Sequence, residues 1–124
     1  MIEEDLDKWI NAYISVYDGD DPIDEEHPCY WAVEKFADLE ADSPQLCWQA
    51  IIGIVEGVPQ HRVLANLASG PMEELVELHG LEYIDKIESQ ARSSSDFRVL
   101  LRELWETTNS AIWTRILHAR ADDE

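Results

Sequence analysis

Basic residues are scarce in this chain. Nine Lys and Arg side chains stand against 27 Asp and Glu among 124 residues, which gives a formal net charge of −18. Proteins that bind nucleic acid or anionic membranes do so largely through clustered Lys and Arg, and a strongly acidic field repels both surfaces. We therefore expect no direct nucleic-acid binding and no membrane association.

The sequence also lacks a long apolar run and is poor in cysteine. No run approaches the ~20 apolar residues that a membrane-spanning helix needs. Residues 1–5 are acidic in character, whereas a secretory signal peptide starts basic and continues apolar. Cys29 and Cys47 are the only cysteines, and two cysteines in a chain of this size are more typical of reduced thiols than of a disulfide. These features predict a soluble, cytoplasmic protein.

Motifs of catalysis and metal binding are missing as well. The sequence contains no phosphate-binding glycine loop, no dinucleotide fingerprint, no His-Glu-x-x-His helix and no hydrolase nucleophile elbow. The acidic stretch that begins at Asp18 fails as a calcium loop, because Ile23 replaces the required glycine and Cys29 replaces the closing glutamate. We therefore expect no catalytic residue, no metal ligand and no cofactor, and the sequence favours a non-enzymatic role.

What is present is helical periodicity. Apolar residues three and four positions apart form a single stripe along the first segment, at Leu6, Trp9, Ile10, Tyr13, Ile14 and Tyr17. Similar patterns predict further helices at about 29–41, 44–55, 59–70, 71–80, 83–91, 94–105 and 112–117. The sequence has no strand-like alternation and no hairpin turn signal. It predicts an all-α single domain of about seven to eight short antiparallel helices, for which stacked helical hairpins are one arrangement.

Glycine and proline mark the expected helix ends. We expect Gly57 to end the helix at 44–55. We expect Gly70 to end one helix and Pro71 to begin the next, since proline is favoured in the first helical turn. His79 and Gly80 are expected to end that helix, where the imidazole would interact favourably with the helix dipole.

The negative charge is concentrated in the first third of the chain. Residues 1–42 carry fourteen acidic and two basic side chains, a net charge of −12, whereas residues 43–121 carry ten acidic and seven basic, a net charge of −3. We therefore divide the single domain into acidic N-terminal helices and loop at 1–42 and a helical core region at 43–121. Uneven charge of this kind attracts basic partners, although charge can also serve solubility alone.

A distinctive set of short motifs runs through the second part of the chain. The motifs are Leu67-Ala68-Ser69-Gly70-Pro71-Met72-Glu73-Glu74-Leu75, His79-Gly80, Ile87-Glu88, Phe97-Arg98, Trp105 and Trp113-x-Arg115. With them the sequence resembles a family of small bacterial proteins, the domain of unknown function 6869, over about residues 44–117. Ser69 and Met72 depart from the Ala and Leu of that pattern, and the acidic first third lies outside it. The resemblance implies a bacterial, cytoplasmic protein and brings no assigned activity.

The leading hypothesis is a non-enzymatic interaction protein that binds a basic protein partner, such as a bacterial immunity protein or an antitoxin. Complementary charge would speed association, and aromatic residues beside the acidic loop would give the interface a desolvated centre. The predicted partner-binding residues are Asp18, Asp20, Asp21, Asp24, Glu25, Glu26, Tyr30 and Trp31. Core packing is the alternative role of Trp31.

The sequence leaves two other functions open. An inhibitor that imitates nucleic acid, of the anti-defence type, would space its carboxylates like phosphates along an exposed surface. A small enzyme or metal protein would use His27, Cys29 or His79. It would show a stoichiometric metal, or a histidine with a strongly perturbed pKa inside a pocket. The sequence leaves the oligomeric state open.

Overall fold

The computed structural model describes residues 3–18, 25–57, 60–105 and 110–120. These residues form helices and short connections, and none of them lies in a strand. The elements are α1 (Glu3–Tyr17), α2 (Trp31–Leu39), α3 (Pro44–Glu56), α4 (His61–Leu67), the π-helical turn η1 (Ala68–Met72), α5 (Glu73–Ser93), α6 (Ser95–Arg102) and α7 (Ser110–Arg120). The prediction of an all-α single domain is confirmed.

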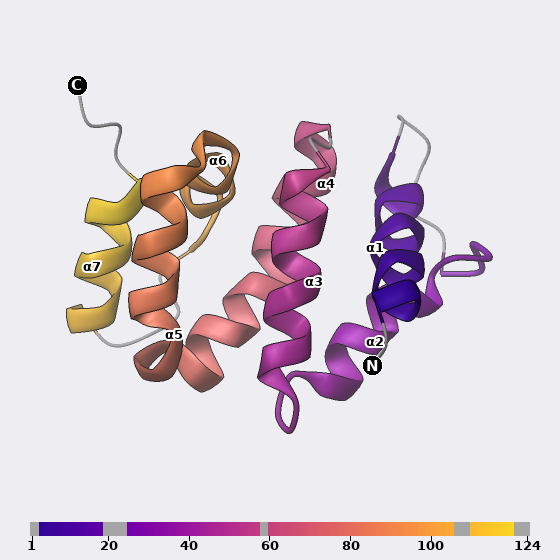
Figure 1. Cartoon of the computed structure of the whole chain (residues 1–124), viewed down its shortest axis with the longest axis horizontal. Helices are drawn as coiled ribbons and strands as arrows, with labels where there is room; N and C mark the ends of the chain where they lie inside the picture. The colour runs from indigo at the N-terminus through magenta and orange to yellow at the C-terminus, as the bar shows by residue number, and fades with distance from the viewer. Residues whose placement is uncertain (1–2, 19–24, 58–59, 106–109, 121–124) are drawn as a thin grey trace.

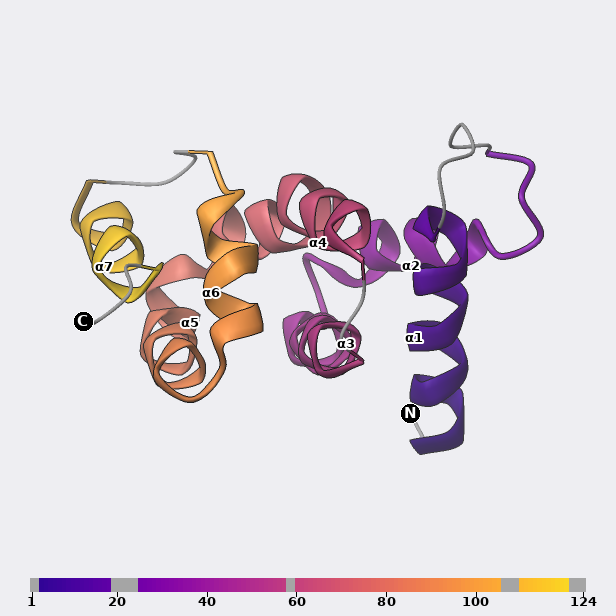
Figure 2. The same ribbon diagram turned by 90° about the horizontal axis from the view of Figure 1, so that it is seen from above.

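The helices are arranged in a row (Figure 1). α1 and α2 lie at one end of the row, α3 and α4 in the middle, and α6 and α7 with the second half of α5 at the other end. α4 and α3 overlap in Figure 1, and the view from above separates them, so the two helices lie in different layers (Figure 2). The most extensive packing contacts join α5 to α7 and α1 to α3. None of the described helices combines the length with the apolar composition that a membrane-spanning helix requires.

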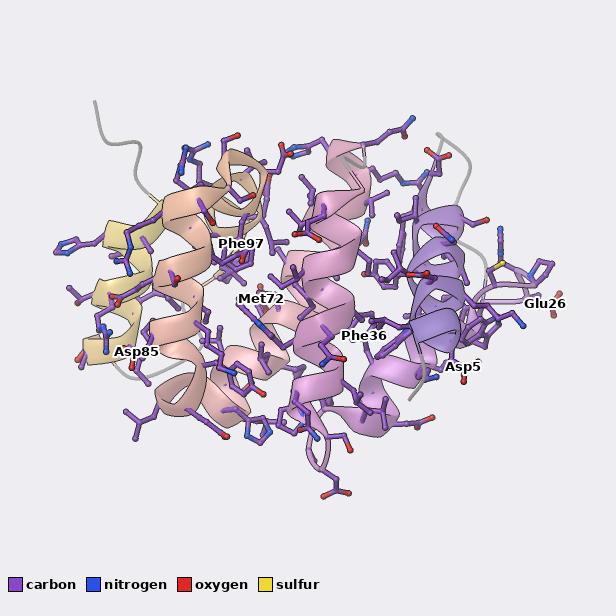
Figure 3. The ribbon with its side chains drawn as sticks, viewed as in Figure 1. Asp5, Glu26, Phe36, Met72, Asp85 and Phe97 are labelled. Carbon is purple, nitrogen blue, oxygen red and sulfur yellow. The ribbon has the colours of Figure 1, made fainter. Side chains whose placement is uncertain are left out.

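The apolar stripes of the helices meet in one continuous core. Figure 3 shows Phe36, Met72 and Phe97 spaced along the row. The core therefore runs through the whole row, because each helix turns its apolar face toward its neighbours. The largest fully buried side chains are Trp9, Tyr13, Phe97, Ile51, Ile54, Leu67, Met72, Leu75, Ile84, Ile87, Leu100 and Leu101.

An aromatic cluster fixes α1 on α2. The Trp9 side chain is fully buried, and its ring centroid lies 4.6 Å from that of Phe36. Its indole Nε1 donates a hydrogen bond of 2.9 Å to the backbone oxygen of Ala32. The Tyr13 ring packs edge-on against Phe36 at 5.3 Å between centroids. The acidic helix α1 therefore buries its predicted stripe in the same core as the rest of the chain.

The helical path does not break between Gly70 and Pro71, so the predicted helix end there is wrong. The path continues from α4 through η1 into α5, and the backbone N–H of Glu73 donates to the oxygen of Ala68, five residues back. Pro71 has no N–H, and in an α-helix its ring would clash with the carbonyl four residues earlier. The wider π-helical turn accommodates both effects.

The predicted helix end at His79 and Gly80 is wrong as well. α5 continues to Ser93 and bends at His79, whose φ of −135° and ψ of 22° are not helical. The ring Nε2 of His79 lies 2.8 Å from the backbone oxygen of Glu40, which follows α2. Because a carbonyl oxygen only accepts hydrogen bonds, Nε2 carries the proton and donates. His79 thus joins the bend to the end of another helix and does not cap its own.

Candidate functional site

Exposed carboxylates gather where α1, the segment at 25–30 and α2 form one end of the row. Figure 3 shows Asp5 and Glu26 at this end. Only Lys8 and Lys35 are basic among residues 1–42, so the field around this end is negative. We call it the acidic end and define it by its exposed carboxylates among the described residues, Asp5, Asp7, Asp18, Glu25, Glu26, Glu34 and Asp38.

Five of the eight predicted partner-binding residues belong to this end. These are Asp18, Glu25, Glu26, Tyr30 and Trp31. The remaining three, Asp20, Asp21 and Asp24, lie outside the described residues. Tyr30 is half-buried and packs against the core, whereas Trp31 is 39% exposed. Of the two roles open to Trp31, the structure therefore favours surface exposure over core packing.

A groove of about 590 Å³ lies beside Trp31. The Nζ atom of Lys35 lies 5.9 Å from the ring centroid of Trp31 and 5.0 Å from that of Trp9. The ammonium group is thus attracted to both indole rings, which helps to orient Trp31. A partly exposed tryptophan at the edge of a groove is a suitable anchor for a partner. The groove is lined by Lys8, Asn11, Ala12, Cys29 and Trp31.

The residues of the metal or enzyme alternative are not brought together. His27 and Cys29 precede α2, and the His27 Nδ1 accepts a hydrogen bond of 3.0 Å from the backbone N–H of Cys29. His79 contacts Glu40, beyond the other end of α2. Both cysteines are free thiols, and burial, with a smaller effect of the Glu40 charge, raises the pKa of Cys47 to about 11. Within the described ranges, no three His, Cys, Asp or Glu side chains gather to hold a metal ion.

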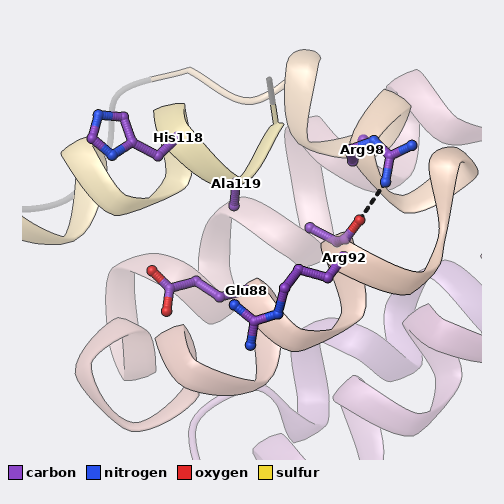
Figure 4. Close-up of a pocket in the computed structure, with 6 residues that line it drawn as sticks. Glu88, Arg92, Arg98, His118 and Ala119 are labelled. Carbon is purple, nitrogen blue, oxygen red and sulfur yellow. Dashed lines mark hydrogen bonds between the residues drawn. The ribbon is translucent and has the colours of Figure 1, made fainter. Parts of the chain in front are cut away.

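A basic groove at the other end of the row was missed by sequence reasoning. It has a volume of about 590 Å³ and lies between α5, α6 and α7 (Figure 4). Six of the nine basic residues fall within residues 86–120, beside four acidic ones. A charge count over windows shorter than 43–121 would have revealed this concentration. The groove is lined by Glu88, Ala91, Arg92, Arg98, His118 and Ala119.

The carboxylate of Glu88, which lines this groove, is hydrogen-bonded to Arg115. Arg115 of α7 donates two hydrogen bonds, of 2.9 and 2.6 Å, to the carboxylate of Glu88 on α5. These bonds hold the pKa of Glu88 below its usual range. Arg98 donates a bond of 2.6 Å to the α5 backbone, and Figure 4 shows His118 pointing away from Arg92 and Arg98. The lining of this groove therefore has more basic than acidic side chains, in contrast to the acidic end.

Comparison with known proteins places the chain in a family. A family model described as a family of unknown function (DUF6869) matches residues 19–123. The chain belongs to this family. The DUF6869 match includes residues 19–42, so the expectation that the acidic first third lies outside the family is wrong from residue 19 onward. No curated protein sequence and no solved structure shows significant similarity to the chain.

Proposed function

We propose that this protein is a non-enzymatic interaction protein whose acidic end binds a basic protein partner. The observation that carries the proposal is the gathering of exposed carboxylates around the exposed Trp31 at one end of the row. Charge supplies long-range attraction, and a surface tryptophan supplies apolar area that a partner can bury. Rapid association with a specific partner needs both the charge and the apolar area.

The carboxylates of the acidic end act mainly on the rate of association. A strongly charged surface accelerates association with a complementary partner by roughly 10–10³-fold, and the effect weakens as salt screens the charges. Each exposed ion pair adds only about 0.2–1 kcal/mol of affinity. The carboxylates therefore select a basic partner, while most of the affinity comes from contacts that exclude water.

Trp31 is the best-placed source of such contacts. It is 39% exposed and borders the groove between α1 and the start of α2. Its neighbour Tyr30 is half-buried and packs against the core. Truncating a tryptophan at the centre of an interface typically costs about 2 kcal/mol or more in binding. Trp31 and the groove form the centre of the proposed interface, and the carboxylates form its polar rim.

An immunity protein or antitoxin that neutralises a cationic toxin is the concrete form of this proposal. Neutralisation requires fast recognition of one partner and no chemistry of its own, and the acidic end supports that task. Imitation of nucleic acid would use the same acidic end against a nucleic-acid-binding protein. The identity of the captured partner therefore distinguishes the two forms.

Affinity capture tests the proposal. The tagged protein is incubated at low salt with a nuclease-treated lysate of its source cells, and the retained proteins are identified by mass spectrometry. One variant neutralises Asp18, Glu25 and Glu26 in the acidic end. A matched control variant neutralises Glu56, Glu77 and Glu82, three exposed carboxylates of α3 and α5.

We expect the unmodified protein and the control variant to retain one basic protein in stoichiometric amount. High salt lowers the retained amount, and the acidic-end variant retains less of the partner than the control variant does, because the steering charge is reduced. Equal retention by both variants, or enrichment of no basic protein at all, contradicts the proposal.

A further inference from the structure

A groove of about 390 Å³ lies over α3, between α1 and the second half of α5. Its lining comes from three residues of α1, five of α3 and one of α5. Both α1 and α5 pack against α3, and Figure 1 shows them on opposite sides of it. α3 therefore forms the floor of the groove, and α1 and α5 form its walls. We call it the α3 groove.

Large apolar side chains that are only half-buried line the α3 groove. They are Leu6 and Ile10 of α1 and Trp48 and Ile52 of α3. Each of them packs against the core and keeps part of its surface exposed. A partner in the groove can therefore reach all four. Adjoining exposed apolar side chains with a polar rim mark interaction sites on protein surfaces.

Trp48 is held rigidly in the floor of the groove. Its ring centroid lies 5.7 Å from that of Tyr83 and 5.8 Å from that of Phe97. Tyr83 is 3% exposed and Phe97 is 0% exposed, so both supporting rings belong to the core. The half-buried indole is thus fixed before a partner arrives, and a partner that covers it loses little side-chain entropy in doing so.

The close approach of α1 to α3 shapes the groove. A Cβ atom at Gly53 would collide with the Ile10 side chain, so the glycine lets α1 pack this close. The lining residues of α3 run from Trp48 to Glu56. Eight residues of α-helix rise about 12 Å, which is roughly two helical turns. The groove is therefore long enough for two turns of a partner helix laid along α3.

The charges at the α3 groove are negative. Asp7 and Glu56 are the charged residues of its lining, and both are exposed. Lys86 does not line the groove, and its Nζ lies 5.4 Å from the ring centroid of Tyr83. Opposite charge on a partner is attracted to such a rim, whereas an acidic partner is repelled.

We infer that the α3 groove binds a basic amphipathic helix of a partner protein. The apolar side chains of that helix, at i, i+3 or i+4, and i+7, cover Trp48 and Ile52, while its Lys or Arg residues lie beside the carboxylates of Asp7 and Glu56. This is the recognition mode in which the apolar face of a helix lies in an apolar groove.

The inference goes beyond the proposed function, because it concerns a second surface. The groove beside Trp31 uses Lys8, Asn11 and Ala12 of α1, and none of these three lines the α3 groove. The two grooves therefore lie on different faces of α1. Asp18, Glu25 and Glu26 do not line the α3 groove either, so the two proposals can fail separately.

Titration of the whole protein with two isomeric peptides separates the apolar face from the charge. Both peptides have roughly 14 residues of Leu and Lys in the same numbers, and only one places its leucines on a single helical face. Fluorescence anisotropy measures their affinities, and amide NMR spectra show whether Ile52 and Gly53 respond. We expect the amphipathic isomer to bind at least about tenfold more tightly and to shift both amides. Equal affinity of the isomers, or no shift at these amides, overturns the inference.

Two pairs of variants test the assigned surface. Ile52→Gln should weaken binding of the amphipathic peptide by about tenfold, because apolar contact is lost. Leu81→Gln is its control at a residue that is 81% exposed and outside the groove. Gln49→Lys places a like charge in the groove at an exposed position, so the fold should be kept. It should weaken binding at least about threefold more than Gln45→Lys, an exposed residue of α3 outside the groove. Equal effects within both pairs overturn the inference.

A second copy of this chain is the competing occupant of the α3 groove. Amide spectra of the protein alone, recorded at low and at high protein concentration, distinguish the two occupants. We expect the amides of Ile52 and Gly53 to keep their positions, because two copies with a net charge of −18 repel each other. Shifts of these amides with protein concentration show that a second copy covers the groove, and they overturn the inference.

Discussion

The imidazole Nε2 of His79 lies 2.8 Å from the backbone oxygen of Glu40, and this hydrogen bond joins the bend in α5 to the end of α2. The side chain of the same Glu40 lines a cavity between α1, α2 and η1. The bond therefore positions a cavity wall through contact between segments 39 residues apart. His79 acts in the structure as a tie between helices.

Replacing His79 by Ala should lower the free energy of unfolding by about 1–2 kcal/mol, because the carbonyl of Glu40 loses its donor. Urea unfolding followed by circular dichroism measures the change. His61→Ala is the matched control, since His61 is an exposed histidine whose Nε2 lies 2.6 Å from Glu103. Exposed pairs of this kind contribute roughly 0.5 kcal/mol. Equal losses in the two variants would contradict the role assigned to His79.

Substitutions of the two tryptophans that flank Lys35 should have different effects on stability and on partner binding. Trp9→Phe should cost about 2–3 kcal/mol of stability, because it removes buried volume and the donor to the oxygen of Ala32. Trp31→Ala should cost less than about 1 kcal/mol, since Trp31 is already 39% exposed. It should nevertheless weaken retention of the partner. Thermal unfolding and affinity capture on both variants test the pair, and a Trp31→Ala protein that binds normally would remove Trp31 from the interface.

The bond between Arg115 and Glu88 should make stability depend on pH. Hydrogen bonding from Arg115 lowers the pKa of Glu88 from its ordinary 4.5. A carboxyl with a lowered pKa in the folded state stabilises the fold above its unfolded pKa, and this contribution disappears as the pH falls through the lowered value. The unmodified protein should therefore exceed Glu88→Gln in stability at pH 7, with the difference closing below pH 4.5. Thermal unfolding across this range measures it, with Glu77→Gln as the control; a constant difference would contradict the assignment.

The two cysteines should differ sharply in reactivity. Cys47 is buried with a pKa raised to about 11, so its thiol stays protonated at pH 8. Cys29 is only half-buried and borders the groove beside Trp31. We expect a colorimetric disulfide reagent to modify one thiol rapidly in the native protein, and Cys29→Ser to abolish that rapid phase. Two thiols that react at one rate would show that Cys47 is accessible.

The spacing of apolar residues along the sequence predicted the fold, because it indicates which face of each helix is buried. Trp9 and Tyr13 stand in the stripe expected for the first helix, and both are fully buried. Helix ends were predicted less well. Pro71 and His79 looked like a start and a stop, yet the chain passes Pro71 through a wider turn and bends at His79 toward Glu40. The bend at His79 is accompanied by a contact with a distant segment, which local propensity does not record, whereas the wider turn at Pro71 is a local way to keep a proline within a helical path.

The candidate sites, like the helices, could be predicted from the sequence only in part. The carboxylates of the acidic end could be predicted because charged side chains on helices are usually exposed. The exposure of Trp31 could not, because aromatic residues occur both in cores and at interfaces. The α3 groove could not be predicted either. Leu6, Trp48 and Gln90 come from three separate elements, and only folding brings them together.

We propose that the acidic end, and not net charge as such, recognises the basic partner. The most direct measurement is the association rate constant of the captured partner, at low and at high salt, with three forms of this protein. These are the unmodified protein, the variant neutralised at Asp18, Glu25 and Glu26, and the control neutralised at Glu56, Glu77 and Glu82. We predict roughly tenfold slower association of the acidic-end variant at low salt, a change of less than about twofold for the control, and convergence of all three at high salt. Equal slowing of the two variants would show that net charge, and not the acidic end, determines the association rate.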